Sequence, residues 1–371
     1  MLGLIIWALT TIFTNTIHNL EERGIQTGFS FLDNVAPFGI GFSPIIEFKL
    51  GTSTYWDVFF IGIQNTILVS VFGVVAATFL GFVIGIMRLS PNWLLSRFAL
   101  TYIEVFRNIP VLLQIMFWNF AIFLPLLPSP RQSLSFADSL FLNGRGLYMP
   151  KPIFDSGVGI WIYAIIATVT VIGLFMMGRW AKKRQDESGE RFPARLIGAG
   201  ILLAVLLIGY FVSGSPISLE LPTLARFNLT GGLEIPLPLF VLWFSLTTYT
   251  ASFIAENVRG GIQSVAKGQT EAACAVGLQR TQMLRLVIIP QAMRVIVPPT
   301  ISQFLNLTKN SSLAVAIAYE EVVNIWAGTA LNQTGQALII IAMTVAVYEC
   351  LSLLTSFALN VYNKRIQLVE R

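Results

Sequence analysis

Long apolar runs constrain this chain more than any other feature of its sequence. Several of them exceed the roughly 18 residues that a helix needs to cross the hydrocarbon core of a bilayer. Of the 371 residues, 55% are hydrophobic and 12% are charged, whereas charged residues make up about 25% of a soluble domain. We predict an all-α polytopic membrane protein, because a membrane β-barrel would show short segments of alternating hydrophobicity instead.

The apolar runs predict about eight transmembrane helices. The first lacks a basic segment and a small-residue cleavage site, so we interpret it as an uncleaved membrane helix and not as a signal peptide. In the seventh, Pro298 and Pro299 predict a bend, and the polar sequence LTKNSS predicts an interruption. The eight predicted ranges are 2–18, 57–87, 98–126, 158–178, 195–213, 238–257, 290–320 and 335–362.

The distribution of Lys and Arg predicts the orientation of these helices. Both residue types are densest in the short loops after residues 87, 178 and 257 and near the C-terminus, and they are sparser in the long segments 19–56 and 127–157. Because cytoplasmic loops carry the excess of positive charge, we expect the first set of loops and both termini in the cytoplasm. The net charge of +5 is therefore a topology signal, and we expect no nucleic-acid partner.

A polar island at residues 257–290 separates two strongly apolar segments. We predict that Gln269 and Thr270 begin a short helix and that Glu271 lies in its first turn, at the positive end of the helix dipole. Gly277 is predicted to adopt a positive φ and to end that helix.

Small side chains follow Glu271 in this island. Ala272 and Ala273 would let the helix sit deeply in a groove of a partner protein, and Leu278 would add an apolar contact after the break. We predict a second helix from Gln279 that stops at Pro290. The alternative is a helical hairpin that only packs beneath its own bundle.

A second group of polar residues lies at predicted membrane depth: Gln303, Asn306, Lys309, Asn310, Ser311 and Glu320. The first two and Asn310 share one helical face. Because a Lys is costly in lipid, Lys309 should face a partner or a wet cavity. In a path for a zwitterion, Lys309 and backbone N–H groups at a helix break would meet the carboxylate, and Glu320 or a carbonyl group would meet the ammonium group. Hydrogen bonding between the helices of paired subunits is the alternative.

Several kinds of chemistry have no counterpart in the sequence. No G-x-x-x-x-G-K-[ST] phosphate loop occurs, and we find no convincing set of nucleophile, base and orienting residue. One histidine, His18, and two cysteines, Cys274 and Cys350, suggest neither a histidine-based metal site nor a disulfide framework. We therefore expect a chain that is not an enzyme and that binds no cofactor or metal.

Four segments resemble permease subunits of ATP-binding-cassette (ABC) importers, closest to the polar amino-acid uptake family. The run SFIAENVRGGIQSVAKGQTEAACAVGLQRTQMLRLVIIPQAMRVIVPP resembles their EAA loop, with Cys274 as a departure from the expected pattern. QNTILVSVFGVVAATFLGFVIGIMRLS and TYIEVFRNIPVLLQIMFW resemble the first two core helices, and SQFLNLTKNSSLAVAIAYEEV resembles the segment after the loop. The motifs SPRQS and LNGRGLYMP, and the extra helix pair 158–213, further resemble a permease subunit of general L-amino-acid importers.

The resemblance implies the five-helix core of a type I importer and a division of the chain. Residues 1–56 would form an N-terminal membrane helix and a periplasmic segment, and 57–126 the first part of the core. Residues 127–237 would hold two periplasmic loops around an inserted helix pair, and 238–371 the second part with the EAA loop at 257–290. The positions that would couple to an ATPase are Glu271, Ala272, Ala273, Gly277 and Leu278.

The implied function is that of a permease subunit in the bacterial inner membrane. It would move L-amino acids from periplasm to cytoplasm by alternating access, within surrounding membrane lipid. The implied partners are a second homologous permease, two ATPase subunits that bind ATP and Mg²⁺, and a periplasmic amino-acid-binding protein. The alternatives are a stand-alone ion-coupled secondary transporter of small polar solutes, a class that commonly shows internal symmetry and midplane acidic residues, and a membrane scaffold without transport activity.

Overall fold

The structure, a computed structural model, describes residues 2–22, 28–137, 139–155, 157–189, 192–224 and 229–366. Its contacts divide the chain into two units. The first contains Met1–Leu127 and Pro236–Arg371, and the second contains Pro128–Ile235. The second unit is therefore inserted between the two parts of the first. Met1 and residues 367–371 lie outside the described part, so the predicted location of the termini stays a prediction.

The first unit is built from helices. Its α-helices are α1 (Leu2–Glu22), α2 (Tyr55–Arg88), α3 (Trp93–Asn108), α4 (Val111–Met116), α5 (Leu124–Leu126), α8 (Leu237–Gln263), α9 (Lys267–Ala275), α10 (Arg280–Met283), α11 (Ile289–Asn310), α12 (Leu331–Thr334) and α13 (Ala337–Ile366). Tighter or wider helical segments lie beside or between them: η1 (Ser30–Asp33), η2 (Phe117–Phe123), η4 (Leu284–Ile288), η5 (Ser311–Ile317) and η6 (Val322–Ala330).

Helices α2 and α8 pack against each other along much of their length, and glycines let their backbones come close. A Cβ atom built on Gly81 would lie 2.6 Å from the Cβ of Ile254, and one built on Gly85 would lie 2.8 Å from the carbonyl oxygen of Ala255. Ile254 and Ala255 are completely buried. Small residues let two membrane helices approach until their backbones nearly touch.

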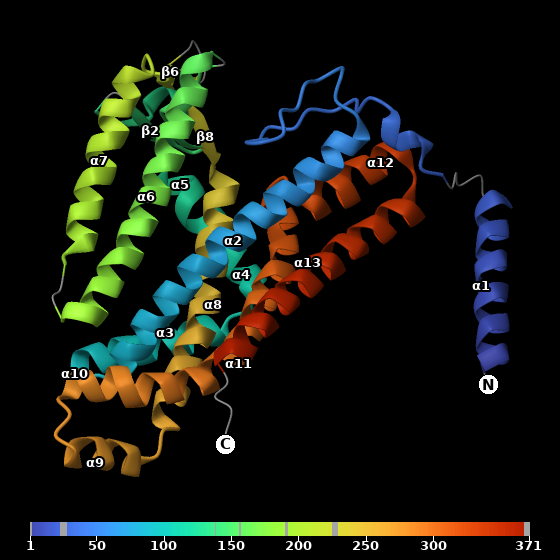
Figure 1. Cartoon of the computed structure of the whole chain (residues 1–371). Helices are drawn as coiled ribbons and strands as arrows, with labels where there is room; N and C mark the ends of the chain where they lie inside the picture. The colour runs from blue at the N-terminus through green and yellow to red at the C-terminus, as the bar shows by residue number, and fades with distance from the viewer. Residues whose placement is uncertain are drawn as a thin grey trace. The chain divides into compact units, whose positions relative to one another are not determined.

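The segment before α2 closes one end of the first unit. Phe31 and Leu32 are buried, and the ring of Phe31 stacks on that of Trp326 with centroids 6.0 Å apart. At the start of α2, the carboxylate of Asp57 accepts a hydrogen bond of 2.7 Å from the backbone N–H of Thr54 and so caps the helix. Figure 1 shows this segment and α12 at the end of the unit opposite to α9 and α10.

Five helices in the described part of the chain are long and apolar enough to cross a membrane. They are Tyr55–Arg88, Val158–Ser188, Leu237–Gln263, the continuous run Arg280–Ile317, and Ala337–Phe357. The other three predicted ranges are helical too, but they differ in form. Residues 2–18 lie in α1, residues 195–213 overlap a shorter apolar helix at Leu196–Val212, and residues 98–126 fall on a bent pair. The count rises to six if the bent pair is one span.

The predicted span 98–126 falls on two helices and not on one continuous helix. The helices Trp93–Asn108 and Val111–Leu126 meet at 105°. The cause is Pro110, because a proline disfavours helical backbone in the residue before it. Ile109 accordingly has extended angles, with φ −100° and ψ 127°.

The prediction that a helix from Gln279 stops at Pro290 is wrong. Helix α10 begins at Arg280, and the helical run continues through the π-helical segment η4 and past Pro290. Pro290 lies within this continuous run, two residues after the end of η4, so the chain stays helical although proline lacks a backbone N–H. Pro298 and Pro299 lie inside α11 without ending it. The LTKNSS sequence marks a change of pitch, because the α-helix gives way to a 3₁₀-helix at Ser311.

The second unit combines a helix pair with short strands. Helices α6 (Val158–Ser188) and α7 (Ala194–Val212) pack on each other, and the strands form small sheets of order β1-β2-β3-β8, β4-β5 and β6-β7. These strands lie within the segments that we predicted as periplasmic loops. The strands are β1 (Leu134–Phe136), β2 (Leu140–Asn143), β3 (Gly146–Met149), β4 (Lys151–Phe154), β5 (Ile217–Glu220), β6 (Thr223–Leu224), β7 (Leu229–Thr230) and β8 (Leu233–Pro236).

Candidate functional site

The polar island folds into a short helix, a sharp turn and a helix that leads into the bundle. Helix α9 begins at Lys267, two residues before the predicted start, so Glu271 is its fifth residue and does not lie in the first turn. The chain enters α9 from Ala266, which has extended angles, and the carbonyl oxygen of Ala266 accepts a hydrogen bond from the N–H of Gln269. The contribution that we expected from the helix dipole to Glu271 is therefore small, since that effect fades beyond the first turn.

The turn after α9 is a Schellman motif centred on Gly277. Gly277 has a φ of +78°, as predicted. Its N–H donates to the carbonyl oxygen of Cys274 at 2.9 Å, and the N–H of Leu278 donates to that of Ala273 at 3.1 Å. Both bonds satisfy carbonyl groups that the end of a helix leaves open.

The five predicted coupling residues divide into an outer and an inner set. Glu271, Ala272 and Gly277 are exposed, whereas Ala273 is only 4% exposed and Leu278 is half-buried. Ala273 and Leu278 flank the turn, where an apolar contact often accompanies a Schellman motif. They therefore hold the shape of the hairpin, and the surface that α9 offers to another molecule comes from the exposed residues.

Side-chain contacts fasten α9 to the helices that follow it. The amide nitrogen of Gln291 in α11 donates to the amide oxygen of Gln269 at 3.1 Å. The thiol of Cys274 lies 3.9 Å from the sulfur of Met283 in α10. These two contacts join α9 to α11 and α10.

The polar residues of α11 occupy one flank of that helix. Asn306 and Lys309 are exposed, and Gln303 and Asn310 are half-buried. Leu307 is completely buried on another side of the helix and faces Gly73 of α2. The four polar side chains therefore form a continuous strip, which we call the α11 polar face.

The two remaining candidates of this group lie elsewhere. Ser311 is completely buried, and its hydroxyl donates to the carbonyl oxygen of Thr308 at 2.7 Å. The carboxylate of Glu320 accepts hydrogen bonds from the backbone N–H groups of Gly41, at 3.0 Å, and Phe42, at 2.7 Å. Glu320 thus fastens the segment before α2 to the turn that follows η5.

A buried polar network next to Glu320 was missed in the sequence. The side-chain amide of Asn65 donates to the carbonyl oxygens of Phe42, at 3.0 Å, and Glu320, at 2.7 Å. The hydroxyl of Tyr319 donates to the carbonyl oxygen of Asn65 at 3.0 Å. These bonds join α2, the segment before it and the turn after η5 at one point.

Glu321 extends this network toward α13. It is completely buried, and its carboxylate accepts hydrogen bonds from the hydroxyl of Tyr348, at 2.8 Å, and from the N–H of Asn324, at 2.9 Å. Its neighbour Glu320 drew attention only as a possible ligand. The available signal was the acidic pair itself, because two adjacent carboxylates at the end of an apolar helix need hydrogen-bond partners.

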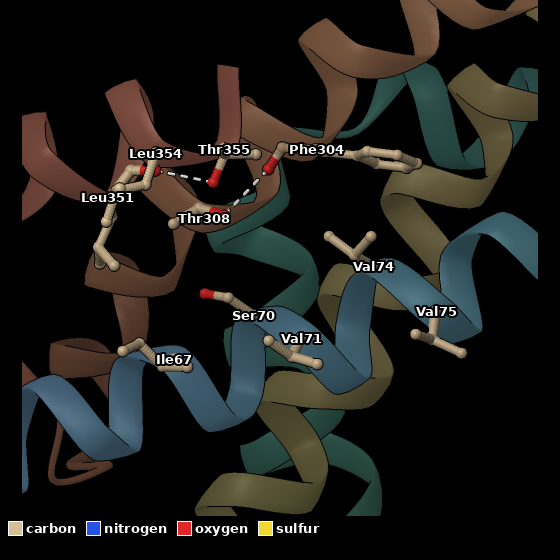
Figure 2. A pocket seen from close by; sticks show the side chains of 10 residues that line it. All are labelled: Ile67, Ser70, Val71, Val74, Val75, Phe304, Thr308, Leu351, Leu354 and Thr355. Atoms are coloured by element: carbon tan, nitrogen blue, oxygen red, sulfur yellow. Dashed lines mark hydrogen bonds between the residues drawn. The ribbon is translucent and has the colours of Figure 1, made fainter. Parts of the chain in front are cut away.

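A groove of about 400 Å³ lies between α2, α11 and α13 (Figure 2). Its lining is apolar apart from three hydroxyl groups. Those of Thr308 and Thr355 donate to carbonyl oxygens of their own helices, and that of Ser70 has no hydrogen-bond partner in the described part of the chain. No charged side chain and no member of the α11 polar face lines this groove. It therefore offers nothing that would orient a zwitterion.

The described residues also contain no cluster of three or more His, Cys, Asp or Glu side chains that could hold a metal ion. The arrangement thus offers a surface for contact with another protein and a polar strip. It consists of a hairpin with an exposed face, a helical connection into the bundle, and a strip of amide and ammonium groups.

Comparison with known proteins places this arrangement in a family. The sequence model of the family described as "Binding-protein-dependent transport system inner membrane component" matches residues 199–368. The chain is 47% identical to the putative amino-acid ABC transporter permease protein YhdX of Escherichia coli (strain K12), with 100% of this chain and 92% of that protein covered.

Two further relatives match the whole of this chain. The general L-amino acid transport system permease protein AapQ of Rhizobium johnstonii is 46% identical, with 90% of that protein covered. The glutamate/glutamine/aspartate/asparagine transport system permease protein BztB of Rhodobacter capsulatus is 37% identical, with 93% covered. The chain therefore belongs to the family of binding-protein-dependent transport system inner membrane components, and it is a multi-pass permease of the ABC transporter type.

Proposed function

We propose that this chain is the permease subunit of an ATP-driven importer of L-amino acids. It takes substrate delivered by a periplasmic binding protein and releases it into the cytoplasm by alternating access. The substrate class is supported by the names of YhdX, AapQ and BztB, which are all amino-acid permeases. Membership of the family favours this function over that of a stand-alone ion-coupled carrier.

The observation that carries the proposal is the hairpin at Gly277. A solitary carrier has no use for an exposed helix that is fastened to a transmembrane helix by a sharp turn. A permease component is not the catalytic subunit of its transporter, and we place ATP hydrolysis on a separate ATPase subunit that binds α9. Glu271, Ala272 and Gly277 form the contact surface, and Ala273 and Leu278 keep the turn in shape.

The coupling follows from the continuity of the helical run that begins at Arg280. A push on α9 passes through the contacts at Gln291 and Met283 into α10 and α11. Because the run extends without a break to Ile317, it carries the movement to the α11 polar face. Nucleotide-driven closure of the ATPase is thereby converted into a change of the substrate path.

The α11 polar face is the part of this chain that we assign to the substrate path. Lys309 supplies a positive charge for the carboxylate of an amino acid, and the amide groups of Gln303, Asn306 and Asn310 supply donors and acceptors. Ser311 supports this face indirectly, because its buried hydroxyl donates a hydrogen bond to the backbone of the helix. Glu320 is a candidate for the ammonium group if the backbone N–H groups of Gly41 and Phe42 release it.

The assembly that we propose contains a second homologous permease, two ATPase subunits and the binding protein. It lies in the bacterial inner membrane with both termini of this chain in the cytoplasm. Residues 57–126 and 238–371 form the permease core, residues 127–237 are an insertion, and residues 1–56 precede the core.

A native thiol allows the coupling surface to be tested. Cys274 in α9 and Cys350 in α13 are the two cysteines of the chain, and both are exposed. The variant Cys350→Ser keeps only the thiol in α9, and the matched control Cys274→Ser keeps only the thiol in α13. Each variant is expressed in cells together with the genes of its proposed partners. Its thiol is then labelled in the intact cells with a photocrosslinker, which forms a bond to any nearby protein on illumination.

We expect the Cys350→Ser variant to be joined to a nucleotide-hydrolysing protein and the Cys274→Ser control not to be joined to it. Uptake of an amino acid into proteoliposomes should then require ATP and the co-purified ATPase. If Cys274 never reaches such a protein in cells that still import the amino acid, the coupling proposal is wrong. Uptake driven by an ion gradient without the ATPase would establish the stand-alone carrier instead.

A further inference from the structure

A second groove lies at the end of the first unit that carries α9. It has a volume of about 510 Å³ and is bounded by the end of α2, the loop after it, the end of α8 and the start of the run from Arg280. Phe82, Ile86 and Ile296 form its inner part. Because these residues belong to helices that cross the membrane, the groove reaches from the end of the bundle into the layer of the lipid chains.

The neighbouring helix α3 indicates where the surface of the membrane lies. Its inner side packs through the buried residues Ala99 and Ile103. On its outer side, Trp93 is 75% exposed and Phe98 is 60% exposed. Tryptophan is enriched at the boundary between the lipid chains and the polar head groups. The mouth of the groove, at Leu89 and Pro91 just before α3, therefore lies at that boundary.

Arg280 contributes a guanidinium group to this otherwise mainly apolar lining. Arg280 lines the groove, is exposed, and makes no side-chain hydrogen bond or ion pair within the described part of the chain. No Asp or Glu lines the groove either. The site thus combines an apolar channel with an uncompensated positive charge, and a ligand that matches it has an apolar chain and an anionic group at its end.

We propose that this groove binds an anionic phospholipid, with an acyl chain between α2 and α11 and, on Arg280, a head-group phosphate whose charge no cation of the same lipid neutralises. Basic side chains at the cytoplasmic ends of membrane helices attract anionic head groups, and burial of the acyl chain adds the hydrophobic contribution. A cytosolic protein is a poorer match, because the inner part of the groove lies at a depth that only lipid or another membrane helix reaches. This inference goes beyond the proposed transport function and is tested without substrate or ATP.

The test uses the assembled importer in lipid nanodiscs. The probes are phosphatidylglycerol and phosphatidylcholine that carry the same photoreactive acyl chain, and labelled peptides are identified by mass spectrometry. Arg280→Gln removes the charge, with Arg285→Gln as the matched control, since Arg285 is exposed nearby but does not line the groove. Ile289→Trp fills the groove, with the exposed Leu286, also outside the lining, changed to Trp as its control.

We expect phosphatidylglycerol to label the groove peptides about fivefold more than phosphatidylcholine, the effect of one favourable charge contact near the surface. Arg280→Gln should abolish this preference, and Ile289→Trp should reduce labelling by both lipids, whereas the two control variants should behave as the unchanged protein does. Equal labelling by both lipids, or the same loss in Arg280→Gln and Arg285→Gln, would overturn the proposal. So would an unlabelled groove whose residues crosslink to the ATPase.

Discussion

At the scale of single residues, Gly277 carries the turn that defines the proposed coupling surface. Its φ of +78° lies in the left-handed region, and a Cβ built on it would meet no atom within 4 Å. A side chain at this position is therefore opposed by the backbone conformation alone and not by a lack of space. The cost of that conformation for an ordinary L-residue is about 1–2 kcal/mol, and asparagine tolerates it better.

This difference predicts an order of activity for variants of Gly277. Gly277→Asn should retain most of the ATP-driven uptake, Gly277→Ala should lose part of it, and Gly277→Pro should abolish it, because proline fixes φ near −65°. Gly268→Ala is the control, since Gly268 lies in α9, the helix before the turn, and also has open space around it. Uptake into proteoliposomes is measured per amount of inserted subunit. Normal uptake by Gly277→Pro would contradict the role of the turn.

Single residues also show which features the local sequence can predict and which it cannot. The positive φ of Gly277 was predicted, because a glycine that follows a run of small helical residues commonly ends a helix in the left-handed conformation. The network around Asn65 was not, because its amide bonds to the carbonyl oxygen of Glu320, 255 positions away. Glu349 illustrates the same limit. It is a charged residue within the range 335–362 predicted as the last helix, yet it is exposed, and its neighbour Tyr348 is the residue that donates a hydrogen bond to Glu321.

At the scale of elements, the contact between α2 and α8 depends on glycines that lie one turn apart. A Cβ on Gly85 would approach the carbonyl oxygen of Ala255 and the Cβ of Val258 to 2.8 Å. These are atoms near the helix axis and not the ends of flexible side chains, so the helices themselves would have to separate. Periodic apolar sequence predicted both helices but gave no means of pairing them.

We predict that Gly85→Ala destabilises the permease by about 1–3 kcal/mol, the usual range for overpacking a well-filled core. The control is Gly260→Ala in α8, where a Cβ would meet nothing within 4 Å. That change should be neutral or slightly stabilising, because alanine favours helix by up to about 1 kcal/mol over glycine. Thermal unfolding of both purified variants in detergent provides the comparison. Equal midpoints would show that the two helices are not held at this distance.

At the scale of the whole molecule, one helical run connects the α9 hairpin to the α11 polar face. Lys309 lies near the far end of that run, exposed and without a hydrogen bond or ion pair from its side chain in the described part of the chain. In a multi-pass membrane protein, an unpaired ammonium group at such a position calls for a partner or a wet cavity. The proposed partner is the carboxylate of the transported amino acid.

Accordingly, Lys309→Met should raise the KM for amino-acid uptake by the assembled importer and leave its assembly intact. Lys309→Arg should preserve more of the affinity, since it keeps the positive charge. Lys182→Met, a change at an exposed lysine of α6 in the other unit, is the control for loss of a charge. A variant that no longer co-purifies with its partners, or that transports with an unchanged KM, would exclude Lys309 from the substrate path.

The sequence by itself determined the membrane character, most of the helical ranges and the turn at Gly277. These depend on composition, on apolar length and on the backbone freedom of one residue, all of which are local properties. Only the tertiary structure decided that Glu320 holds Gly41 and Phe42, and that Arg280 lines an apolar groove without an acidic partner in the described part of the chain. The physical reason is that these features arise where segments far apart in the chain meet, and no local periodicity records which segments those are.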